Sequence, residues 1–532
     1  QHGHSRMRAK RFLTALAILV GWPGWLRAEL EVATDFEGGS AIIDTIDSER
    51  CEIGIRPGGD PERGWPCWWY FRIDGLAVGQ EARVVVRGSE RHARIDGVDS
   101  GGPLAPDWSL PTRAAVSADG LTWRQTEPGD READQVTYRL TGTGDPLWVA
   151  WGPPFTSRER DALLDRAVAA LPRHASAFEL ARSLEGRPVR GLRITAHQQE
   201  RLPAIWIQAR QHAWESGSSW VARGFVEWLL GDAPEAAWLR DHADVFVIPV
   251  LDVDRVATGD GGKESSPHDH NRDWTATPHY PEVAGVQRRL SLLAEENRLA
   301  MFLDLHCPAP ADQRPFFFVP PAELLTDGGR AHRDRFLTFA ARRLDAPLPV
   351  AASPRVTGSS YHPLWRQISG AWVSEHANPG TVAACLETPW NTPHSTTAGY
   401  LDIGAKLGRA VTDSLRFRES PGSVSNESAG HAVPAAAHLS NVGAQPDPVR
   451  YGRDVLPIMS ARCFACHGPD EEGRQADLRL DLEADAKADR DSGPVIVPGK
   501  PDESQLIARV TSSDAGLVMP PGDSHKPLTA PQ

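Results

Sequence analysis

The stretch AIWIQARQHAWESGSSW, residues 204–220, decides the expected fold because a polar loop joins two kinds of apolar pattern in it. The first seven residues form a short apolar run of strand length, and the following WVARGFVEWLL repeats apolar residues at helical spacing. Strand, loop and helix in this order are typical of an α/β sheet with helices on both faces. The loop carries His212 and Glu215 at the end of the strand, where ligands bind in such sheets.

The same alternation continues outward from this stretch, from residue 158 to residue 418. Strand-like runs such as DVFVIPV, AMFLDLH and TVAACLE alternate with helical periods such as VAGVQRRLSLLAEENR. Residues 29–157 instead show short alternating runs cut by turn residues, which predict an all-β sandwich. Residues 419–448 are rich in Ser, Ala, Gly and Pro and predict a flexible linker, so residues 449–532 form a small separate domain.

Length and charge set outer limits on the function. A chain of 532 residues predicts two to four domains, and a net charge of -13 argues against nucleic-acid binding. Residues 1–28 contain a start at Met7, a basic segment and an apolar run, which together predict a secretory signal peptide. We expect an exported protein, periplasmic or extracellular, with no stable membrane span after signal removal.

The six cysteines fall in three pairs along the chain. In an exported protein Cys51 and Cys67 could form a disulfide, although sequence alone does not give the pairing. Cys307 and Cys385 flank two candidate site residues, and we expect core or rim thiols there, with a disulfide between neighbouring strands as the alternative.

Polar residues with chemical potential follow the ends of several predicted strands. His306 ends the run AMFLDLH, Glu387 ends TVAACLE, and Arg272 lies in HDHNRDW. A His-x-x-Glu pair completed by a distant His is a zinc-ligand set that leaves one position open for water. Glu387 supplies a carboxylate base for that water, and the planar Arg272 suits a substrate carboxylate.

Four motifs, ARQHAWESGSSW, DHNRDW, FLDLHCP and CLETPW, resemble the zinc carboxypeptidase family. They are most similar to its cytosolic carboxypeptidase branch, in which a β-sandwich precedes the catalytic α/β domain with its mixed sheet. The resemblance covers about residues 29–418.

The resemblance implies a role for each matching residue. His212, Glu215 and His306 would hold Zn²⁺, and Glu387 would be the general base that activates water and then protonates the leaving amine. Asn271 and Arg272 would bind the terminal carboxylate of the substrate, which makes such an enzyme act at the C-terminal end of a peptide.

The sequence departs from the family pattern in the loops around Asn271. The family has an Arg that polarises the scissile carbonyl, and here Lys263 is the candidate, with Arg255 as another. Asp252 and Asp254 lie in a differently built loop. Tyr361 is the nearest candidate for the Tyr that closes over the substrate.

Further residues around these motifs allow two interpretations each. His268, His270 and His279 indicate either a second metal site or, as we favour, a solvated hydrogen-bonded loop. Asp304 is two residues before His306 on the strand and either orients that ligand or makes an ordinary buried hydrogen bond.

The stretch LPIMSARCFACHGPD, residues 456–470, contains Cys-x-x-Cys-His. A redox dithiol would need a βαβ setting and structural zinc would need two more ligands, so covalent haem c is the favoured interpretation. Cys463 and Cys466 would attach the haem and His467 would bind its iron. Met519 is the expected second axial ligand, with His525 as the alternative.

The tail, residues 449–532, resembles the planctomycete-type cytochrome c domain through DVLPIMSARCFACHGPD and LVMPPGDSHKPLTAPQ. The resemblance implies a small α-helical domain. The sequence stops where such domains enter a last helix, so we expect either a longer parent chain or an incomplete haem fold.

We therefore predict an exported zinc metallocarboxypeptidase that carries a haem c module. Its substrates would be peptide or protein C-termini, and the haem would have a redox partner. The main alternative is a haem c electron-transfer or binding protein whose carboxypeptidase-like domain binds peptide or peptidoglycan termini without cleaving them. Deacylation of a small acyl-amino acid is a third possibility.

Overall fold

The computed structural model describes residues 29–95, 98–197 and 201–419 and, with gaps, residues 455–524. The chain divides into two compact units, Gln1–Glu427 and Ser428–Gln532, which we describe separately. The predicted signal peptide and nearly all of the predicted linker lie outside the described residues. No helix within the described ranges is long and apolar enough to cross a membrane.

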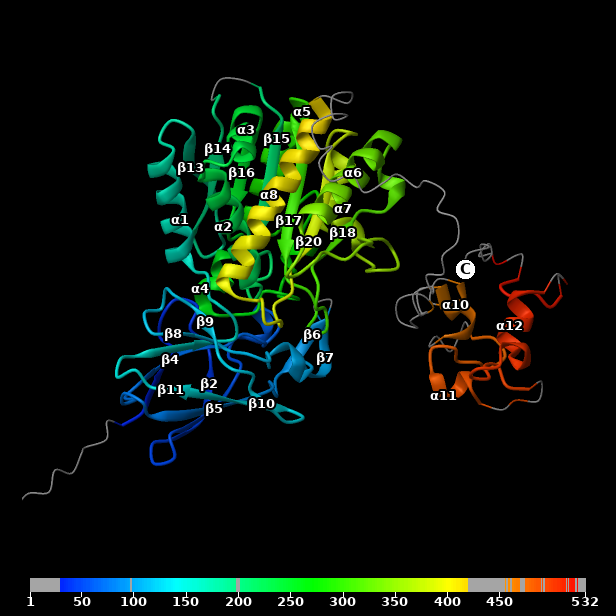
Figure 1. The fold of residues 1–532 in the computed structure, drawn as a ribbon, viewed down its shortest axis with the longest axis horizontal. Helices are drawn as coiled ribbons and strands as arrows, with labels where there is room; N and C mark the ends of the chain where they lie inside the picture. Colours follow the sequence, from blue (N-terminus) through cyan, green and yellow to red (C-terminus); the bar gives the residue numbers. More distant parts are fainter. Residues whose placement is uncertain are drawn as a thin grey trace, which may run out of the picture. The chain divides into compact units, whose positions relative to one another are not determined.

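The N-terminal part of the first unit is β-rich, as its alternating sequence predicts, and Figure 1 shows it in blue to cyan. One five-stranded sheet has the order β1 (Glu31–Ala33), β4 (Tyr70–Asp74), β12 (Leu147–Ala150), β8 (Ala115–Ser117), β9 (Arg124–Gln125). The other has the order β10 (Asp130–Arg131), β11 (Gln135–Thr141), β5 (Glu81–Arg87), β3 (Glu52–Arg56), β2 (Ile42–Asp47). A separate hairpin is formed by β6 (His92–Ile95) and β7 (Val98–Pro103). The buried rings of Trp69 and Tyr138 meet between the two sheets with centroids 6.0 Å apart.

The rest of the first unit is an α/β domain built on an eight-stranded mixed sheet. Its order is β13 (Ala175–Arg182), β14 (Pro188–Ile194), β16 (Asp244–Ile248), β15 (Ala204–Ala209), β17 (Leu299–His306), β20 (Val382–Glu387), β18 (Phe316–Val319), β19 (Arg355–Val356). The central strands β16, β15, β17 and β20 are parallel, and β13, β14 and β18 make antiparallel pairs at the sides. The expected α/β domain with a mixed sheet is therefore confirmed.

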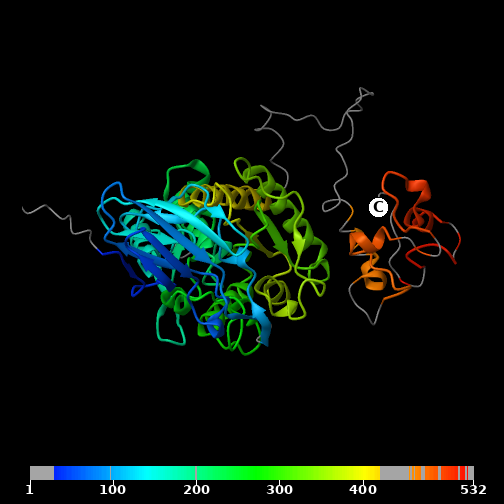
Figure 2. The same cartoon turned by 90° about the horizontal axis from the view of Figure 1, so that it is seen from below.

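Helices cover both faces of this sheet (Figures 1 and 2). They are α1 (Ser157–Ala170), α2 (Ser216–Leu230), α3 (Pro234–His242), α4 (Val253–Thr258), α5 (Pro281–Glu295), α6 (Asp327–Arg343), α7 (Ser369–His376), α8 (Thr397–Glu419). Short 3-10 turns are η1 (Pro61–Arg63), η2 (Pro106–Trp108), η3 (His270–Arg272), η4 (Ala322–Leu324), η5 (Trp365–Gln367). Helices α2 and α8 pack closely where they cross, and this close packing requires glycine. A Cβ on Gly404 of α8 would lie 2.1 Å from the carbonyl oxygen of Val221 in α2.

The parallel strands bring the candidate site to one edge of the sheet. His306 and Glu387 are partners in the register of β17 and β20, and Gln208 of β15 is the partner of Asp304. Parallel strands place their carboxyl ends at the same edge, so the loops that follow them converge there. The β-rich part packs against this edge, where Thr112 N donates to Asn391 Oδ1 at 2.7 Å.

All six cysteines are free thiols. The disulfide considered for Cys51 and Cys67 is therefore absent, and so is the one considered for Cys307 and Cys385. Cys51, Cys67 and Cys307 are buried and take part in the apolar core of the first unit.

The second unit contains short helices around a small apolar cluster. Its described elements are α10 (Phe464–His467), α11 (Glu483–Ala486), η7 (Pro501–Glu503), α12 (Gln505–Val510). Met459, Leu480, Ala486 and Val495 form the cluster, and Cys463 packs against it.

Candidate active site

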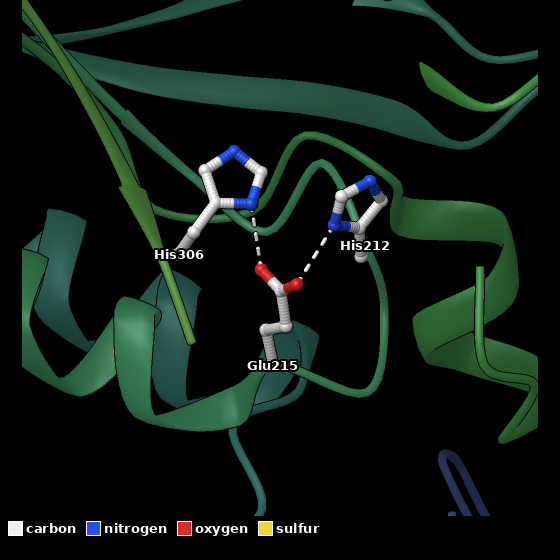
Figure 3. A group of neighbouring side chains, drawn as sticks. All are labelled: His212, Glu215 and His306. Carbon is white, nitrogen blue, oxygen red and sulfur yellow. Dashed lines mark hydrogen bonds and ion pairs between the residues drawn. The ribbon is translucent and has the colours of Figure 1, made fainter. Parts of the chain in front are cut away.

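The residues predicted to hold a metal come together at the carboxyl edge of the sheet. His212 lies in the loop after β15, Glu215 is the N-cap of α2, and His306 is the last residue of β17. One nitrogen from each imidazole and one oxygen of the carboxylate lie within 4.8 Å of one another, and all three side chains are buried. Figure 3 shows both rings pointing at the carboxylate. At the N-terminus of α2 the helix dipole also favours the ionised form of Glu215.

The same ring atom of each imidazole faces Glu215. Nδ1 of His212 lies 2.7 Å from Oε1, and Nδ1 of His306 lies 2.8 Å from Oε2. The second contact lacks hydrogen-bond geometry, so Oε2 has no hydrogen-bond donor among the described residues. An orphaned buried oxygen between two imidazole nitrogens fits a cation-binding position, and two nitrogens with a carboxylate are ligands suited to zinc.

The other ring nitrogen of each histidine lies close to a second carboxylate. Nε2 of His212 lies 3.0 Å from Oδ1 of Asp269, and Nε2 of His306 lies 3.3 Å from Oδ1 of Asp304. The hydrogen bond to Asp269 fixes the tautomer of His212 that leaves Nδ1 free as a ligand. The Asp304 contact lacks hydrogen-bond geometry, because Oδ1 has no hydrogen-bond partner among the described residues, so the orienting role considered from the sequence stays a prediction. We did not foresee the role of Asp269, although its place two residues before Asn271 was a usable signal.

Carboxylates outnumber imidazoles among the buried groups at this position. Burial alone would lower the pKa of His306, yet the Asp304 and Glu215 carboxylates raise it well above its usual value. Burial would raise the pKa of Glu215, but the two imidazoles lower it to about 2. Three carboxylates around two imidazoles are costly to bury without a counter-charge, which a divalent cation would supply.

Glu387 lies beside this group as the last residue of β20, and its side chain is half-buried. Burial raises the pKa of Glu387 to about 7, while the imidazole of His306 opposes the rise. Its Oε2 has no hydrogen-bond partner among the described residues, and the Cys385 thiol lies 3.9 Å from Oε1. A carboxylate with a pKa near neutrality can accept and return a proton.

Arg272 is buried without an ion-pair partner. Its side chain is 5% exposed, Nη1 donates to the Asn271 carbonyl at 2.9 Å, and Nε has no partner. Within the described ranges no carboxylate makes a salt bridge with this guanidinium. A buried cation of this kind is costly unless an anion joins it, so it can bind a ligand carboxylate.

Both polar atoms of the Asn271 side-chain amide have a partner in the protein. Oδ1 accepts from Ser369 N at 3.0 Å, and Nδ2 lies 3.4 Å from Nε2 of His306. Its side chain therefore links the start of α7 to a candidate metal ligand.

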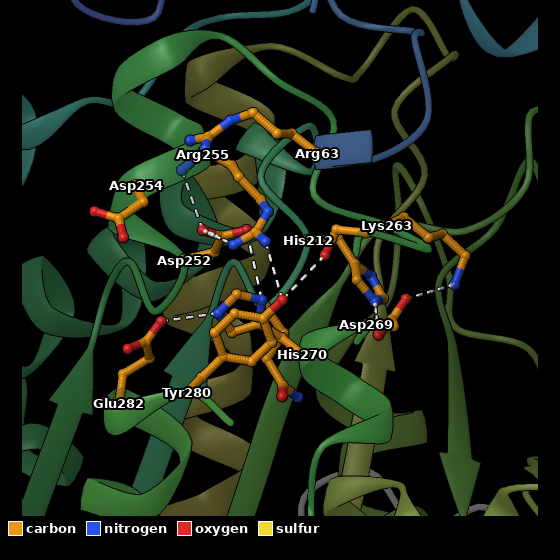
Figure 4. Close-up of polar contacts among 12 residues, drawn as sticks. Arg63, His212, Asp252, Asp254, Arg255, Lys263, Asp269, His270, Tyr280 and Glu282 are labelled. Carbon is orange, nitrogen blue, oxygen red and sulfur yellow. Dashed lines mark hydrogen bonds and ion pairs between the residues drawn. The ribbon is translucent and has the colours of Figure 1, made fainter. Parts of the chain in front are cut away.

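Lys263 approaches the site from the loop before η3 (Figure 4). Its side chain is 18% exposed, and Nζ lies 3.9 Å from Oδ2 of Asp269. Burial would lower the pKa of Lys263, but the Asp269 carboxylate raises it above its usual value, so the side chain is a cation at neutral pH. Tyr361 is 44% exposed, and its ring packs on Phe318 with centroids 4.9 Å apart.

Arg255 and His270 belong to a buried network behind the site (Figure 4). Arg255 Nη2 donates to Tyr280 Oη at 2.9 Å, and its Nη1 lies 3.5 Å from Asp252. His270 stacks on Tyr280 with centroids 3.7 Å apart and lies 2.8 Å from Glu282. Both side chains thus have partners within the network.

The other histidines of this region form no further metal group in the described part of the chain. His279 Nδ1 lies 3.0 Å from Asp273, and its ring packs on His268. These contacts fit the hydrogen-bonded loop that the sequence favoured, but His270 is fully buried rather than solvated.

The second unit places the Cys-x-x-Cys-His motif on α10. Cys463 is the N-cap, and Cys466 is exposed. Nδ1 of His467 lies 3.1 Å from the Gln475 carbonyl, which leaves Nε2 open, and burial lowers the pKa of this imidazole. A neutral imidazole with its Nδ1–H donated to a carbonyl fits an axial haem ligand.

Met519 follows α12 in the same unit. Its side chain is half-buried, and its backbone N donates to the Arg509 carbonyl at 3.1 Å. His525, the alternative ligand, lies outside the described residues.

The fold and the site of the first unit define a metallocarboxypeptidase-like α/β domain. Residues 161–287 match the family model described as zinc carboxypeptidase, and residues 463–523 match the one described as planctomycete cytochrome C. The chain thus joins a zinc carboxypeptidase-type domain to a planctomycete cytochrome c-type domain, and the resemblance found in the sequence is confirmed.

Curated relatives support the expected branch of the family. Cytosolic carboxypeptidase 2 of Danio rerio is 27% identical over 262 residues, which are 45% of this chain and 35% of the relative. Cytosolic carboxypeptidase 3 of Mus musculus is 32% identical over 105 residues, 19% of this chain and 10% of the relative. The matched part of this chain thus covers 35% of the length of the zebrafish relative and 10% of the length of the mouse relative.

Solved structures share the fold of the first unit. A metallo-carboxypeptidase from Burkholderia cenocepacia matches with a TM-score of 0.60 and 21% identity, over 73% of this chain and 100% of that chain. A metallo-carboxypeptidase from Pseudomonas aeruginosa, in complex with (2-guanidinoethylmercapto)succinic acid, matches with a TM-score of 0.56 and 20% identity, over 73% and 99%.

Proposed function

We propose that the protein is an exported zinc metallocarboxypeptidase that removes C-terminal residues from peptides or proteins and carries a haem c module. The observation that carries this proposal is the buried, unpaired guanidinium of Arg272 on the same edge as the His212, Glu215 and His306 group. A cation fixed there would bind the terminal carboxylate of a polypeptide and present its last peptide bond to the site.

Each remaining residue has a role in this proposal. Zinc, when held by His212, Glu215 and His306, would supply a Lewis acid that lowers the pKa of a water molecule. Glu387 would take a proton from the attacking water and return it to the leaving amine.

Three further residues would act on the substrate itself. The Lys263 ammonium would stabilise negative charge on the scissile carbonyl as a point charge rather than a bidentate fork. The exposed Tyr361 would close over the bound residue, and Asn271 would support Arg272 at the terminal carboxylate. The succinic acid compound in the Pseudomonas aeruginosa structure carries carboxylates of the kind that Arg272 would bind here.

The second unit would attach haem c through Cys463 and Cys466, with His467 and Met519 as axial ligands. The hydrogen bond from His467 Nδ1 to the Gln475 carbonyl supports this assignment because it directs Nε2 outward. The haem would exchange electrons with a redox partner.

One observation favours the second candidate, a haem c protein whose peptidase-like domain binds C-termini without cleaving them. The position expected to polarise the carbonyl is occupied by Lys263, whose ammonium is drawn toward Asp269. A weakened oxyanion site lowers turnover more than binding.

The test is metal analysis and a visible spectrum on protein made in an exporting, haem-maturing host, followed by peptide hydrolysis. We expect about one zinc per chain, lost in His306→Ala, and a c-type haem spectrum, lost in Cys463→Ser. Glu387→Gln should keep the zinc and lose hydrolysis of peptides with a free C-terminus. Zinc-loaded protein that binds such peptides without cleaving them would establish the second candidate instead.

A further inference from the structure

The β-rich part reaches into the candidate active site through the loop after η1. Trp65 N donates to the Lys263 carbonyl at 2.9 Å, and Gly262 N donates to the Arg63 carbonyl at 3.0 Å. The two backbones touch, because a Cβ on Gly64, whose φ is +122°, would lie 2.1 Å from Gly262 N. The loop that carries Lys263 is therefore pinned to a segment about 200 residues earlier in the chain.

Ion pairs of Arg63 strengthen the contact between the loop after η1 and the loop that carries Lys263. The Arg63 guanidinium bonds Asp260, at the base of the Lys263 loop, and reaches Glu185 at 2.7 Å. Figure 4 shows Arg63 entering the site region from the β-rich segment. Asp260 also accepts from Asp60 N at 2.8 Å, so both ends of the segment hold the loop.

The side chain of Trp65 lies directly against the ammonium of Lys263. Lys263 Nζ lies over the indole, 5.4 Å from the ring centroid, which is within cation–π distance. The ring is fixed by its Nε1, which donates to the Arg94 carbonyl at 2.9 Å, and by Trp108, whose centroid is 4.8 Å away. The ammonium thus has an immobilised aromatic face in reach and the Asp269 carboxylate 3.9 Å away.

We propose that Trp65 is a positioning residue for Lys263, so that the β-rich part supplies a piece of the active site rather than a mere support. The inference rests on the proposed function, in which Lys263 faces the scissile carbonyl. A lysine has a flexible four-carbon stem, and a loose ammonium would be drawn to the nearby Asp269 carboxylate. The aromatic face offers a competing attraction that holds the charge away from full contact with Asp269 and available to the substrate.

The test is a double-mutant cycle on the full, zinc-loaded chain with a peptide substrate. Lys263→Gln should lower kcat on the order of 100-fold, as the loss of one oxyanion donor does. Trp65→Leu should lower kcat on the order of tenfold with little change in KM, and Trp65→Phe, which keeps an aromatic face, should recover most of it. In the Lys263→Gln background, Trp65→Leu should cost nothing more.

The matched control is Trp148→Leu. Trp148 is a half-buried tryptophan of β12 with its own cation–π partner, Arg72, at 5.9 Å. It should leave kcat near the wild-type value. Additive losses in the cycle, or an equal loss in Trp148→Leu, would overturn the inference because Trp65 would then act only through packing.

A second readout does not depend on turnover. Lysine is rare in this chain, so reductive methylation with a ¹³C label gives few methyl resonances, and Lys263→Arg identifies the one of interest. That resonance should be shifted upfield by the indole, and the shift should disappear in Trp65→Leu and persist in Trp148→Leu. An unshifted resonance in the wild type would overturn the pairing of Lys263 with Trp65.

The two readouts separate this inference from the proposed function. If the wild type cleaves no peptide but the Lys263 resonance depends on Trp65, the positioning is supported and the hydrolysis fails. If the wild type cleaves peptides but the cycle is additive, the hydrolysis is supported and the positioning fails.

Discussion

Nε2 of His212 lies 3.0 Å from Oδ1 of Asp269, and this contact leaves Nδ1 as the ring nitrogen that is free to act as a ligand. The carboxylate is itself fixed, because Oδ1 accepts from Asn271 N at 2.7 Å and Oδ2 accepts from Glu264 N at 2.9 Å. The ring orientation of one candidate ligand is therefore determined by the short η3 segment, 57 residues further along the chain.

Asp269→Asn should weaken zinc binding by about 10- to 100-fold, because an amide holds the imidazole less firmly and lowers its basicity. Competition with a chromophoric chelator measures this affinity. Asp312→Asn is the control, since Asp312 pairs with Arg355 on the surface of the same domain. Equal zinc affinity in wild type and Asp269→Asn would exclude the orienting role.

The pH dependence of hydrolysis should report Glu387. Base function needs the carboxylate, so kcat/KM should rise with pH through the pKa of this group. Burial raises that pKa to about 7 without a metal, and a bound cation lowers it, so the acidic limb should have its midpoint below about 7. Glu387→Gln should lower kcat about 100-fold or more and abolish the limb; an unchanged limb in this variant would assign it to another group.

The metal-free protein offers a second check on Glu387. Its folded-state pKa is raised above the unfolded value, so its stabilising contribution is present below about 4.5 and is lost as pH rises through about 7. As the pH rises over this range, the Tm of the wild type should therefore fall relative to the Tm of Glu387→Gln. A difference that stays constant with pH would argue against the raised pKa.

Arg272→Gln should raise KM about 10- to 100-fold for a peptide with a free C-terminal carboxylate, because a charge-assisted bidentate contact is lost. The same peptide with an amidated C-terminus should be a poor substrate for both proteins. Because no carboxylate of the described residues makes a salt bridge with this buried guanidinium, we expect the Tm of Arg272→Gln to equal or exceed that of the wild type. Equal cleavage of free and amidated peptides by the wild type would remove the carboxylate-binding role.

Met519→Leu should lower the reduction potential of the haem and change its visible spectrum, because a thioether axial ligand raises the potential. Met459→Leu is the matched control, since Met459 is buried in the apolar cluster of the same unit. Identical potentials in Met519→Leu and the wild type would show that another residue binds the iron.

Gly404→Ala should destabilise the first unit by about 1–3 kcal/mol, because the new methyl group would lie 2.1 Å from the Val221 carbonyl and push α8 away from α2. Thermal unfolding with and without the change measures it. The new Cβ in Gly328→Ala, in α6, would meet only Thr326 Oγ1, at an ordinary contact distance of 3.9 Å, so this change should be neutral or slightly stabilising. Equal Tm values for the two variants would mean that the helix crossing has room to adjust.

The site was predictable where its residues follow strand ends. His306 and Glu387 end apolar runs, and parallel strands carry such residues to a common edge, so the sequence was enough to bring them together. The free thiols were harder, because whether Cys51 and Cys67 pair depends on a distance that composition does not encode.

The contact between Trp65 and Lys263 could not be predicted. This contact forms because two loops from different parts of the fold meet, and no local sequence pattern indicates that they do. The Asp269 contact was intermediate, since Asp269 lies beside a recognisable motif but its target is a ring in another loop.

The absence of disulfide bonds has a consequence for handling the protein. Folding of the first unit requires no oxidant, so it should be obtainable from a reducing cytoplasm as well as from an oxidising compartment. Three of its four thiols are buried, whereas Cys466 of the second unit is exposed and, in haem-free protein, should be the first to react with an alkylating reagent. Alkylation of haem-free protein therefore allows folding of the first unit to be studied separately from haem attachment.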